Sequence, residues 1–155
     1  MSLTPTPLVA TFAYNAIGNM TFKSDAGTYS YPAPGQPRPH AVASISGGII
    51  NTTFTYDTKG NMTSGNGLTI AYTSFNKPAT ITRGTNTISF AHDTEQQRYS
   101  QTSLAGVTLY IHGGGVFAER FAGIGGGVQW TNYLIVGGRL IGVYIQKADE
   151  TTATR

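Results

Sequence analysis

The stretch "YDTKGNM", residues 56–62, repeats a phrase that the chain has already used as "YNAIGNM" at residues 14–20. The residues just upstream repeat as well, "TFTY" against "TFAY". In both copies an Asp or Asn follows a Tyr, and a Gly stands three positions after that Asp or Asn. Asp and Asn side chains accept hydrogen bonds from backbone amides two residues further on, and so they start turns. The phrase therefore predicts a reverse turn that the sequence contains at least twice.

Alternation on both sides of the phrase favours a β-hairpin. Residues 53–56 form the expected incoming strand and residues 61–63 begin the outgoing strand. Asp57 closes the turn, the next two residues suit the centre of a type I turn, and Gly60 supplies the positive φ of a bulge. The residues that this geometry demands are those that repeat, whereas the pair between them varies. This distribution is typical of a unit that builds structure.

Two weaker copies follow, "YTSFNKP" at residues 72–78 and "HDTEQQR" at residues 92–98. The first places Asn where Gly stood, and Asn is the residue that next best tolerates a positive φ. The second keeps the Asp and replaces the aromatic residue by His92. The residues assigned to the structural repeat are Tyr14, Asn15, Gly18, Asn19, Tyr56, Asp57, Gly60, Asn61, Tyr72, Asn76 and Asp93.

The rest of the chain also contains short runs in which larger apolar residues alternate with smaller or polar ones, as in residues 68–72 and 88–92. Gly, Asn and Pro separate these runs. Such a pattern predicts an all-β fold of consecutive antiparallel hairpins in a twisted, open sheet, with no helix. Residues 9–147 are expected to form this β domain, and residues 31–40, which hold four prolines, a loop within it. Residues 1–8, whose opening "MSL" is compatible with a vector-derived start, and residues 148–155 are expected to be tails.

Composition argues against several classes of function. Charged residues make up 11% of the chain, its net charge is +3, and its cations are scattered singly, so no basic stripe is available for nucleic acid. Cysteine is absent, which removes thiolate metal sites and a Cys nucleophile. No apolar run approaches the roughly 20 residues of a membrane-spanning helix, and the N-terminus does not resemble a signal peptide.

Motifs of metal-binding or phosphate-binding sites are not found either. The three histidines show no metal-ligand spacing. "DTKGN" departs from a calcium loop, because its third position is Lys59 and its Gly comes too early. "AGIGGG", residues 122–127, resembles a phosphate loop, but an expected strand follows it where a helix is needed. The sequence therefore predicts no enzyme and no catalytic, cofactor-binding or metal-binding residue.

The stretch "FTYDTKGNMTSGNGLTIAYTSFNKPATITRGTNTISFAHDTEQQRYSQTS", residues 54–103, closely resembles the YD repeats of bacterial RHS proteins. "WTNYLIVGGRLIGVYIQ", residues 130–146, is similar to the stretch before the RHS-associated core, and the likeness spans roughly residues 11–146. Members of this family, which includes wall-associated proteins, wind YD repeats into a β-spiral that in toxin members encloses a cargo domain. The resemblance implies a secreted or cell-surface bacterial protein of which this chain is a shell wall, without the self-cleaving core and toxin, and with neighbouring repeats and a cargo domain as partners.

Aromatic residues leave one alternative open, because exposed Tyr and Trp side chains on a sheet can stack on sugar rings. The residues considered for glycan contact are Tyr29, Tyr31, Trp130 and Tyr133. The competing interpretation is that they form cross-strand pairs that stabilise the sheet. Unpaired strand edges also predict self-association as a homodimer, with the apolar residues 131–146 as its expected interface.

Overall fold

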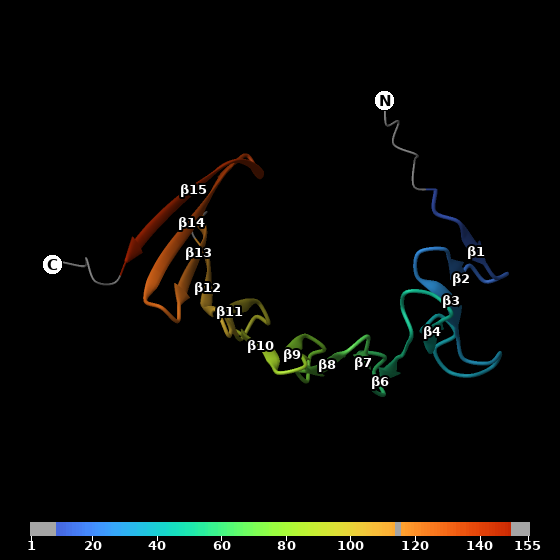
Figure 1. Cartoon of the computed structure of the whole chain (residues 1–155). Helices are drawn as coiled ribbons and strands as arrows, with labels where there is room; N and C mark the ends of the chain where they lie inside the picture. Colours follow the sequence, from blue (N-terminus) through green and yellow to red (C-terminus); the bar gives the residue numbers. More distant parts are fainter. Residues whose placement is uncertain (1–8, 114–115, 150–155) are drawn as a thin grey trace, which may run out of the picture. The chain divides into compact units, whose positions relative to one another are not determined.

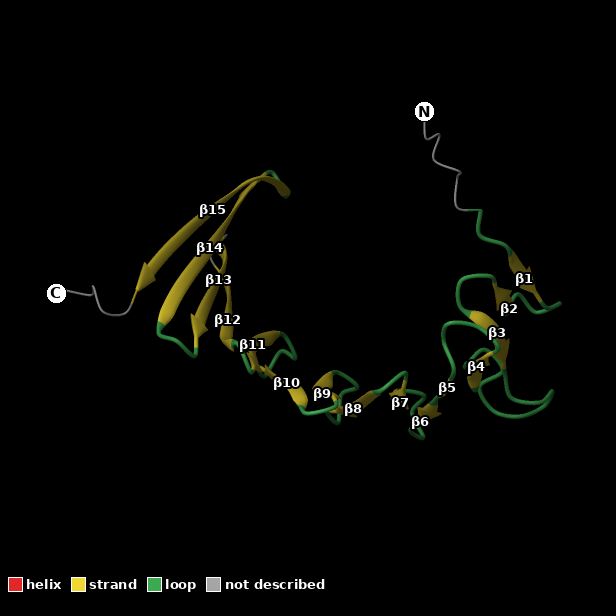
Figure 2. Ribbon diagram, in the orientation of Figure 1, coloured by secondary structure: helices red, strands yellow, loops and turns green. Residues whose placement is uncertain are grey.

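A computed structural model describes residues 9–113 and 116–149, and this part of the chain contains fifteen strands and no helix (Figure 2). The all-β prediction is thereby confirmed. The strands are β1 (Phe12–Tyr14), β2 (Met20–Lys23), β3 (Gly27–Ser30), β4 (Ser44–Ser46), β5 (Thr52–Thr53), β6 (Thr55–Tyr56), β7 (Met62–Gly65), β8 (Leu68–Tyr72), β9 (Pro78–Arg83), β10 (Asn86–His92), β11 (Arg98–Ser103), β12 (Gly106–Gly113), β13 (Val116–Gly123), β14 (Gly127–Val136) and β15 (Arg139–Asp149). No helix in the described ranges is long and apolar enough to cross a membrane.

The strands form two open antiparallel sheets of consecutive hairpins. One sheet has the order β1-β2-β3-β4-β5, and the other runs from β6 to β15 without a crossover. Figure 1 shows β12 to β15 side by side in chain order. Within each sheet every strand lies beside its neighbours in sequence, which is the pattern of consecutive hairpins that the alternating runs predicted.

The prediction of one continuous sheet is wrong, and the break falls at Phe54. Residues 53–56 were expected to be a single strand, but β5 ends at Thr53 and β6 begins at Thr55. The amide of Phe54 instead donates to the carbonyl of Ala43 at 2.9 Å. Its ring lies directly over Gly65, so closely that a Cβ at that glycine would overlap ring atoms. Phe54 thus stays bonded to the first sheet while its ring packs on a glycine of β7, and the chain changes sheets directly after it.

The chain divides into two compact units, which meet between Thr69 and Ile70 within β8. Each unit has little interior. Ala26 and Ile45 are the buried apolar side chains found in the first unit, and Ala118 is the one found in the second, among the residues whose placement is described. Most large apolar side chains of β12 to β15 are more than a third exposed. Hydrogen-bonded ladders and cross-strand pairs therefore hold each unit together, in place of a central core.

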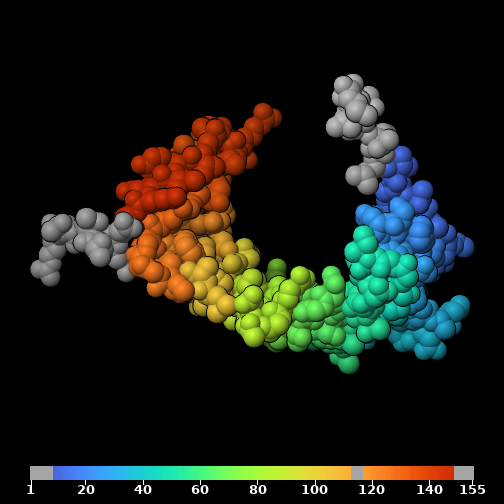
Figure 3. All heavy atoms as spheres, in the orientation of Figure 1, coloured from blue at the N-terminus to red at the C-terminus, as the bar shows by residue number. Residues whose placement is uncertain are grey.

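The last hairpin is the longest element of the second unit. β14 and β15 pair from Val136 and Arg139 at the turn to Gly127 and Asp149 at the open end. In Figure 3 the atoms of β13 to β15, orange to red, follow one another along the chain. β15 extends to Asp149, so the first two residues of the segment expected to be a tail belong to a strand. The expected tails at residues 1–8 and 150–155 lie outside the described residues.

Candidate functional site

Four turns of the same construction follow β1, β6, β8 and β10. In each turn a capping residue has its amide bonded to the carbonyl four residues later, at 2.8–2.9 Å. Its own carbonyl accepts from the amide three residues later, at 3.0–3.1 Å. Its side-chain oxygen accepts a second bond, from the amide four residues later, at 2.8–3.1 Å. The capping residues are Asn15, Asp57, Thr73 and Asp93.

One position in each turn, three residues after the cap, has a positive φ. Gly18 and Gly60 have φ values of 83° and 90°, which confirms the predicted role of these glycines. Asn76 follows with a φ of 62°, as its place in the third copy predicted. In the fourth turn the residue is Gln96, with a φ of 61°. Glutamine has no special tolerance for this conformation, so residue type did not identify Gln96, and it did not identify the cap Thr73 either. Spacing identifies both, because Gln96 lies three residues after Asp93 and Thr73 lies three residues before Asn76.

A second irregularity recurs in three of the four hairpins. Tyr14 pairs with Met20, but the preceding residue pairs with Phe22, so Thr21 is an extra residue on the second strand. The same step leaves Thr63 extra in the β6–β7 hairpin and Tyr99 extra in the β10–β11 hairpin. An extra residue of this kind bends its strand and increases the local twist. The repeat therefore specifies a turn followed by a bulge.

Between these turns the chain reverses through tighter ones. β7 and β8 are joined through Asn66 and Gly67, both with positive φ, which is the type I′ pattern. Two residues also separate the paired Arg83 and Asn86, and two separate Ser103 and Gly106. From β6 to β12, capped turns and two-residue turns therefore alternate.

Motif residues of the first unit also fix the proline-rich loop between β3 and β4. Asn19, which is buried, donates its side-chain amide to the carbonyl of Pro39 at 2.7 Å and pairs with His40 Nδ1 at 2.6 Å. The hydroxyl of Tyr56 donates to the carbonyl of Val42 at 2.9 Å. Burial raises the pKa of Tyr56, so this phenol stays protonated and remains a donor. Two repeat residues thus bind the C-terminal part of this loop, residues 39–42.

Asp57 is the capping residue with the most polar partners. One carboxylate oxygen accepts the amides of Lys59 and Asn61, each at 2.9 Å, and the other accepts the Asn61 side chain at 2.9 Å. These hydrogen bonds, that from the Asn61 side chain first, hold the pKa of Asp57 below its ordinary value of 3.8. The carboxylate is thus engaged in closing the turn.

Two of the three histidines considered as metal ligands pack against aromatic rings, and the glycine-rich stretch considered as a phosphate loop lies in a turn between strands. The His92 ring meets Phe75 edge to face at a centroid distance of 5.5 Å, and His112 lies 4.7 Å from the Phe117 ring. No group of three or more His, Asp or Glu side chains is placed to hold a metal ion within the described ranges. The glycines of residues 122–127 lie where β13 turns into β14, and a strand follows them as predicted.

The four aromatic residues considered for glycan contact belong to both units. In the first unit, the Tyr31 hydroxyl donates to the carbonyl of Met20 at 2.8 Å, and burial raises its pKa. Tyr29 lies on β3 opposite Ile45. In the second unit, Trp130 and Tyr133 are three residues apart on β14, so their side chains project from opposite faces of the sheet.

Trp130 and Tyr133 also have different neighbours. The guanidinium of Arg120 lies 6.0 Å from the Trp130 ring. The Tyr133 hydroxyl donates to Glu119 at 3.1 Å, and its ring packs on Phe117 at 5.0 Å. Burial and the bond to Glu119 raise the pKa of Tyr133. The structure therefore does not bring Trp130 and Tyr133 together as one stacking platform.

Comparison with known proteins adds no assignment. A scan against protein-family models gives no match to the chain, and a search of the curated proteins finds no match.

Proposed function

We propose that the chain is a non-catalytic structural segment of a bacterial RHS or YD-repeat protein. Its role is to form part of the wall of a shell that encloses a toxin or other cargo domain, in a secreted or cell-surface protein. The observation that carries the proposal is the capped turn, which recurs four times with the same hydrogen bonds although its cap is Asn, Asp or Thr. A turn that keeps its geometry while its residues vary is suited to a structural repeat.

The side chains of these turns support a structural role in a second way. Asp57 and Asp93 each use one carboxylate oxygen to accept two backbone amides of their own turn. A general acid, a nucleophile or a metal ligand would need such an oxygen directed at a reaction partner. The thin interior of each unit is also expected of a repeat that is stabilised by further repeats on either side.

The test is the coding sequence around this chain. The proposal expects further copies of the phrase, with Asp or Asn followed three positions later by Gly or Asn, in the same reading frame. It also expects a separate domain after the last copy. A reading frame that ends close to both ends of the chain, with no other copy, would contradict the assignment.

Self-association through the strand edge is part of the same proposal. The order of the ten-stranded sheet ends at β15, which has eleven residues and exposes Leu140, Ile141 and Val143 by 58%, 66% and 48%. A long apolar edge is a template for another strand, and two-fold pairing of β15 with its copy is the simplest closed arrangement. Light scattering should give a mass near twice 16.4 kDa at high concentration.

A matched pair of variants would locate that interface. Val143→Lys places a charge in the middle of β15 and should return the chain to a monomer, because an edge lysine opposes strand pairing. Ile49→Lys, at an 85% exposed position in the first unit, should leave the mass unchanged. A wild-type mass that stays at the monomer value up to about 100 μM would contradict the dimer.

The carbohydrate-binding alternative, through Tyr29, Tyr31, Trp130 and Tyr133, has less support. A flat platform needs aromatic rings on one face, and the two candidates on β14 face opposite ways. Tyr31 and Tyr133 also use their hydroxyls within the protein.

A further inference from the structure

The turn end of the last hairpin, residues 134–141, extends beyond the third strand of its sheet and is called the hairpin tip below. β14 pairs with β13 from Val128 to Tyr133, whereas residues 134–136 pair only with β15 among the described residues. Figure 2 shows β14 and β15 continuing past β13 to the turn that joins them. The hairpin tip is therefore a two-stranded projection from the second unit.

Both faces of the hairpin tip are apolar and open to solvent. Neighbouring residues of a strand point to opposite faces, and Leu134, Ile135 and Val136 follow one another on β14. These three side chains and those of Leu140 and Ile141 are between 45% and 66% exposed. A layer of protein packed on a sheet covers one face of it. Covering both faces at once needs an environment that surrounds the hairpin tip, as a lipid bilayer does.

The composition of the hairpin changes from apolar to polar with distance from its turn. Tyr133 and Tyr144 lie directly behind the hairpin tip, one rung apart and on opposite faces. Tyrosines are enriched at membrane–water interfaces, where their rings lie at the level of the headgroups. Further from the turn, Gln129 pairs with Lys147. The order of apolar tip, aromatic band and polar base is the order of acyl chains, headgroups and water at a membrane surface.

Charge in this hairpin is positive only. Residues 127–148 contain Arg139 and Lys147 but no Asp or Glu. Arg139 begins β15 at the turn and is exposed, and no ion pair of it is found in the described part of the chain. A long arginine side chain can hold its guanidinium beside lipid phosphates while the aliphatic residues around it lie deeper. Anionic headgroups therefore complement the charge of the hairpin tip.

The reach of the hairpin tip fits a shallow insertion. Residues 134–136, at a rise of about 3.4 Å each, place the turn about 10 Å beyond Tyr133. Amphipathic elements that lie in the membrane interface are buried by about 5–10 Å. Deeper insertion would remove water from the outer main-chain edges of the hairpin, whose polar groups lipid cannot satisfy. The dimensions thus suit entry into the headgroup and upper acyl region.

We propose that the hairpin tip inserts into the interface of a bilayer that contains anionic lipid. Its five aliphatic side chains enter the acyl boundary, Arg139 binds lipid phosphate, and the two tyrosines lie among the headgroups. Such insertion does not depend on the shell-wall function. The dimer proposed above pairs the main-chain edge of β15, which leaves both faces of the hairpin tip open, so the dimer and the lipid contact can fail independently.

Flotation of the full 155-residue chain with large unilamellar vesicles tests the proposal. Mixed phosphatidylcholine–phosphatidylglycerol vesicles supply the anionic surface, and pure phosphatidylcholine vesicles are the neutral comparison. We expect about fivefold tighter binding to the mixed vesicles, the contribution of one cation at an anionic surface. Arg139→Gln should lose this preference. Arg83→Gln is its matched control and should keep it, because it removes an exposed cation at the end of β9.

Val136→Asp tests the apolar part of the contact. A carboxylate in the acyl region is costly, so this variant should bind both kinds of vesicle at least tenfold more weakly. Ile49→Asp makes the same change of charge at an 85% exposed position of the first unit and should alter binding to neutral vesicles less than twofold. Circular dichroism checks the fold of each variant.

Fluorescence reports the insertion itself. Trp130 is the single tryptophan of the chain, so Ile135→Trp in a Trp130→Phe background places the fluorophore at the hairpin tip. Its emission should shift to the blue when mixed vesicles are added, and this measurement decides the matter if Val136→Asp is unfolded.

The proposal is overturned if the wild type does not float with mixed vesicles, or if the tip emission is unchanged by them. It is also overturned if Val136→Asp binds as the wild type does, if Ile49→Asp is as damaging, or if Arg139→Gln keeps the anionic preference. A wild type that ignores vesicles, together with a dimer mass that Val136→Asp abolishes, would assign the hairpin tip to the contact between copies instead.

Discussion

Replacing Gly60 by Val tests the turn geometry directly. Gly60 has a φ of 90°, and no atom lies within 4 Å of the place where a Cβ would stand. The substitution therefore creates no clash, and its cost comes from the backbone alone. An L-residue in the left-handed region costs about 1–2 kcal/mol, with β-branched residues at the upper end. A less flexible unfolded chain returns about 0.4–1 kcal/mol of this, so the net loss should be near 1 kcal/mol.

Two further variants test whether the loss of stability comes from the positive φ of Gly60. Gly60→Asn should cost less than Gly60→Val, because Asn76 already occupies the equivalent position of the third turn with a φ of 62°. Gly125→Val is the control, at a glycine with equally open surroundings and no positive φ. It should change stability by no more than a few tenths of a kcal/mol.

Native-state hydrogen exchange is the suitable assay because it reports opening residue by residue, and the chain divides into two compact units. The free energy of opening should fall by about 1 kcal/mol for amides of the β6–β7 hairpin in Gly60→Val, and amides of β13 and β14 should keep theirs. The reasoning is refuted if Gly60→Val and the wild type exchange alike, or if the Gly125→Val control loses as much stability as Gly60→Val.

Two other predictions concern side chains around the same hairpin. The pKa of Asp57 is lowered in the folded chain, so its contribution to stability is present above its ordinary value of 3.8 and is lost as the pH falls through the folded value. The gap in urea midpoint between wild type and Asp57→Asn should therefore shrink from pH 7 to pH 2.5, and a constant gap would contradict this role. Tyr56→Phe removes the bond to the carbonyl of Val42 and should cost about 0.5–1.5 kcal/mol, seen as faster exchange in residues 41–46. Tyr99→Phe, at a 46% exposed tyrosine, is its control and should have no effect on those amides.

Local chemistry made the turns predictable, because each is closed within five residues by groups whose preferences are known. Asp57 and Gly60 are the favoured residue types at their positions, and the sequence places them correctly. Gln96 was missed because its positive φ is imposed by the rest of its turn rather than preferred by the residue. The extra residues Thr21, Thr63 and Tyr99 were missed for a similar reason, since a bulge depends on the pairing of two strands.

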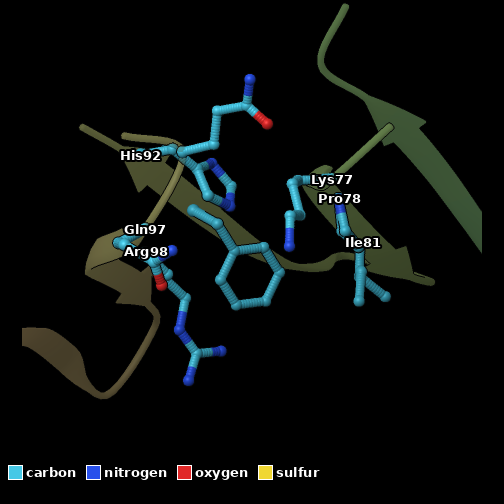
Figure 4. Close-up of a pocket in the computed structure, with 8 residues that line it drawn as sticks. Lys77, Pro78, Ile81, His92, Gln97 and Arg98 are labelled. Carbon is cyan, nitrogen blue, oxygen red and sulfur yellow. The ribbon is translucent and has the colours of Figure 1, made fainter. Parts of the chain in front are cut away.

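Features that depend on residues distant in sequence were not predicted. The break between the two sheets occurs where the Phe54 ring packs on Gly65 and its amide bonds to Ala43. The residues around Phe54 contain no pattern that predicts either interaction. A surface hollow lined by Lys77, Phe90 and Arg98 (Figure 4) likewise depends on β9 and β11 lying on either side of β10. Single scattered cations in the sequence gave no sign of such a pairing.

The alternation of a capped turn with a two-residue turn has a consequence for how such a gene can change length. One capped turn, one tight turn and the two strands between them return the chain to its starting direction along the sheet. Duplication or loss of one whole repeat would therefore leave every downstream strand pointing the same way, whereas loss of a single strand would reverse all of them. Recombination between repeats can thus add or remove coding DNA in these steps without a new fold, which makes the number of repeats a quantity that evolution can adjust freely.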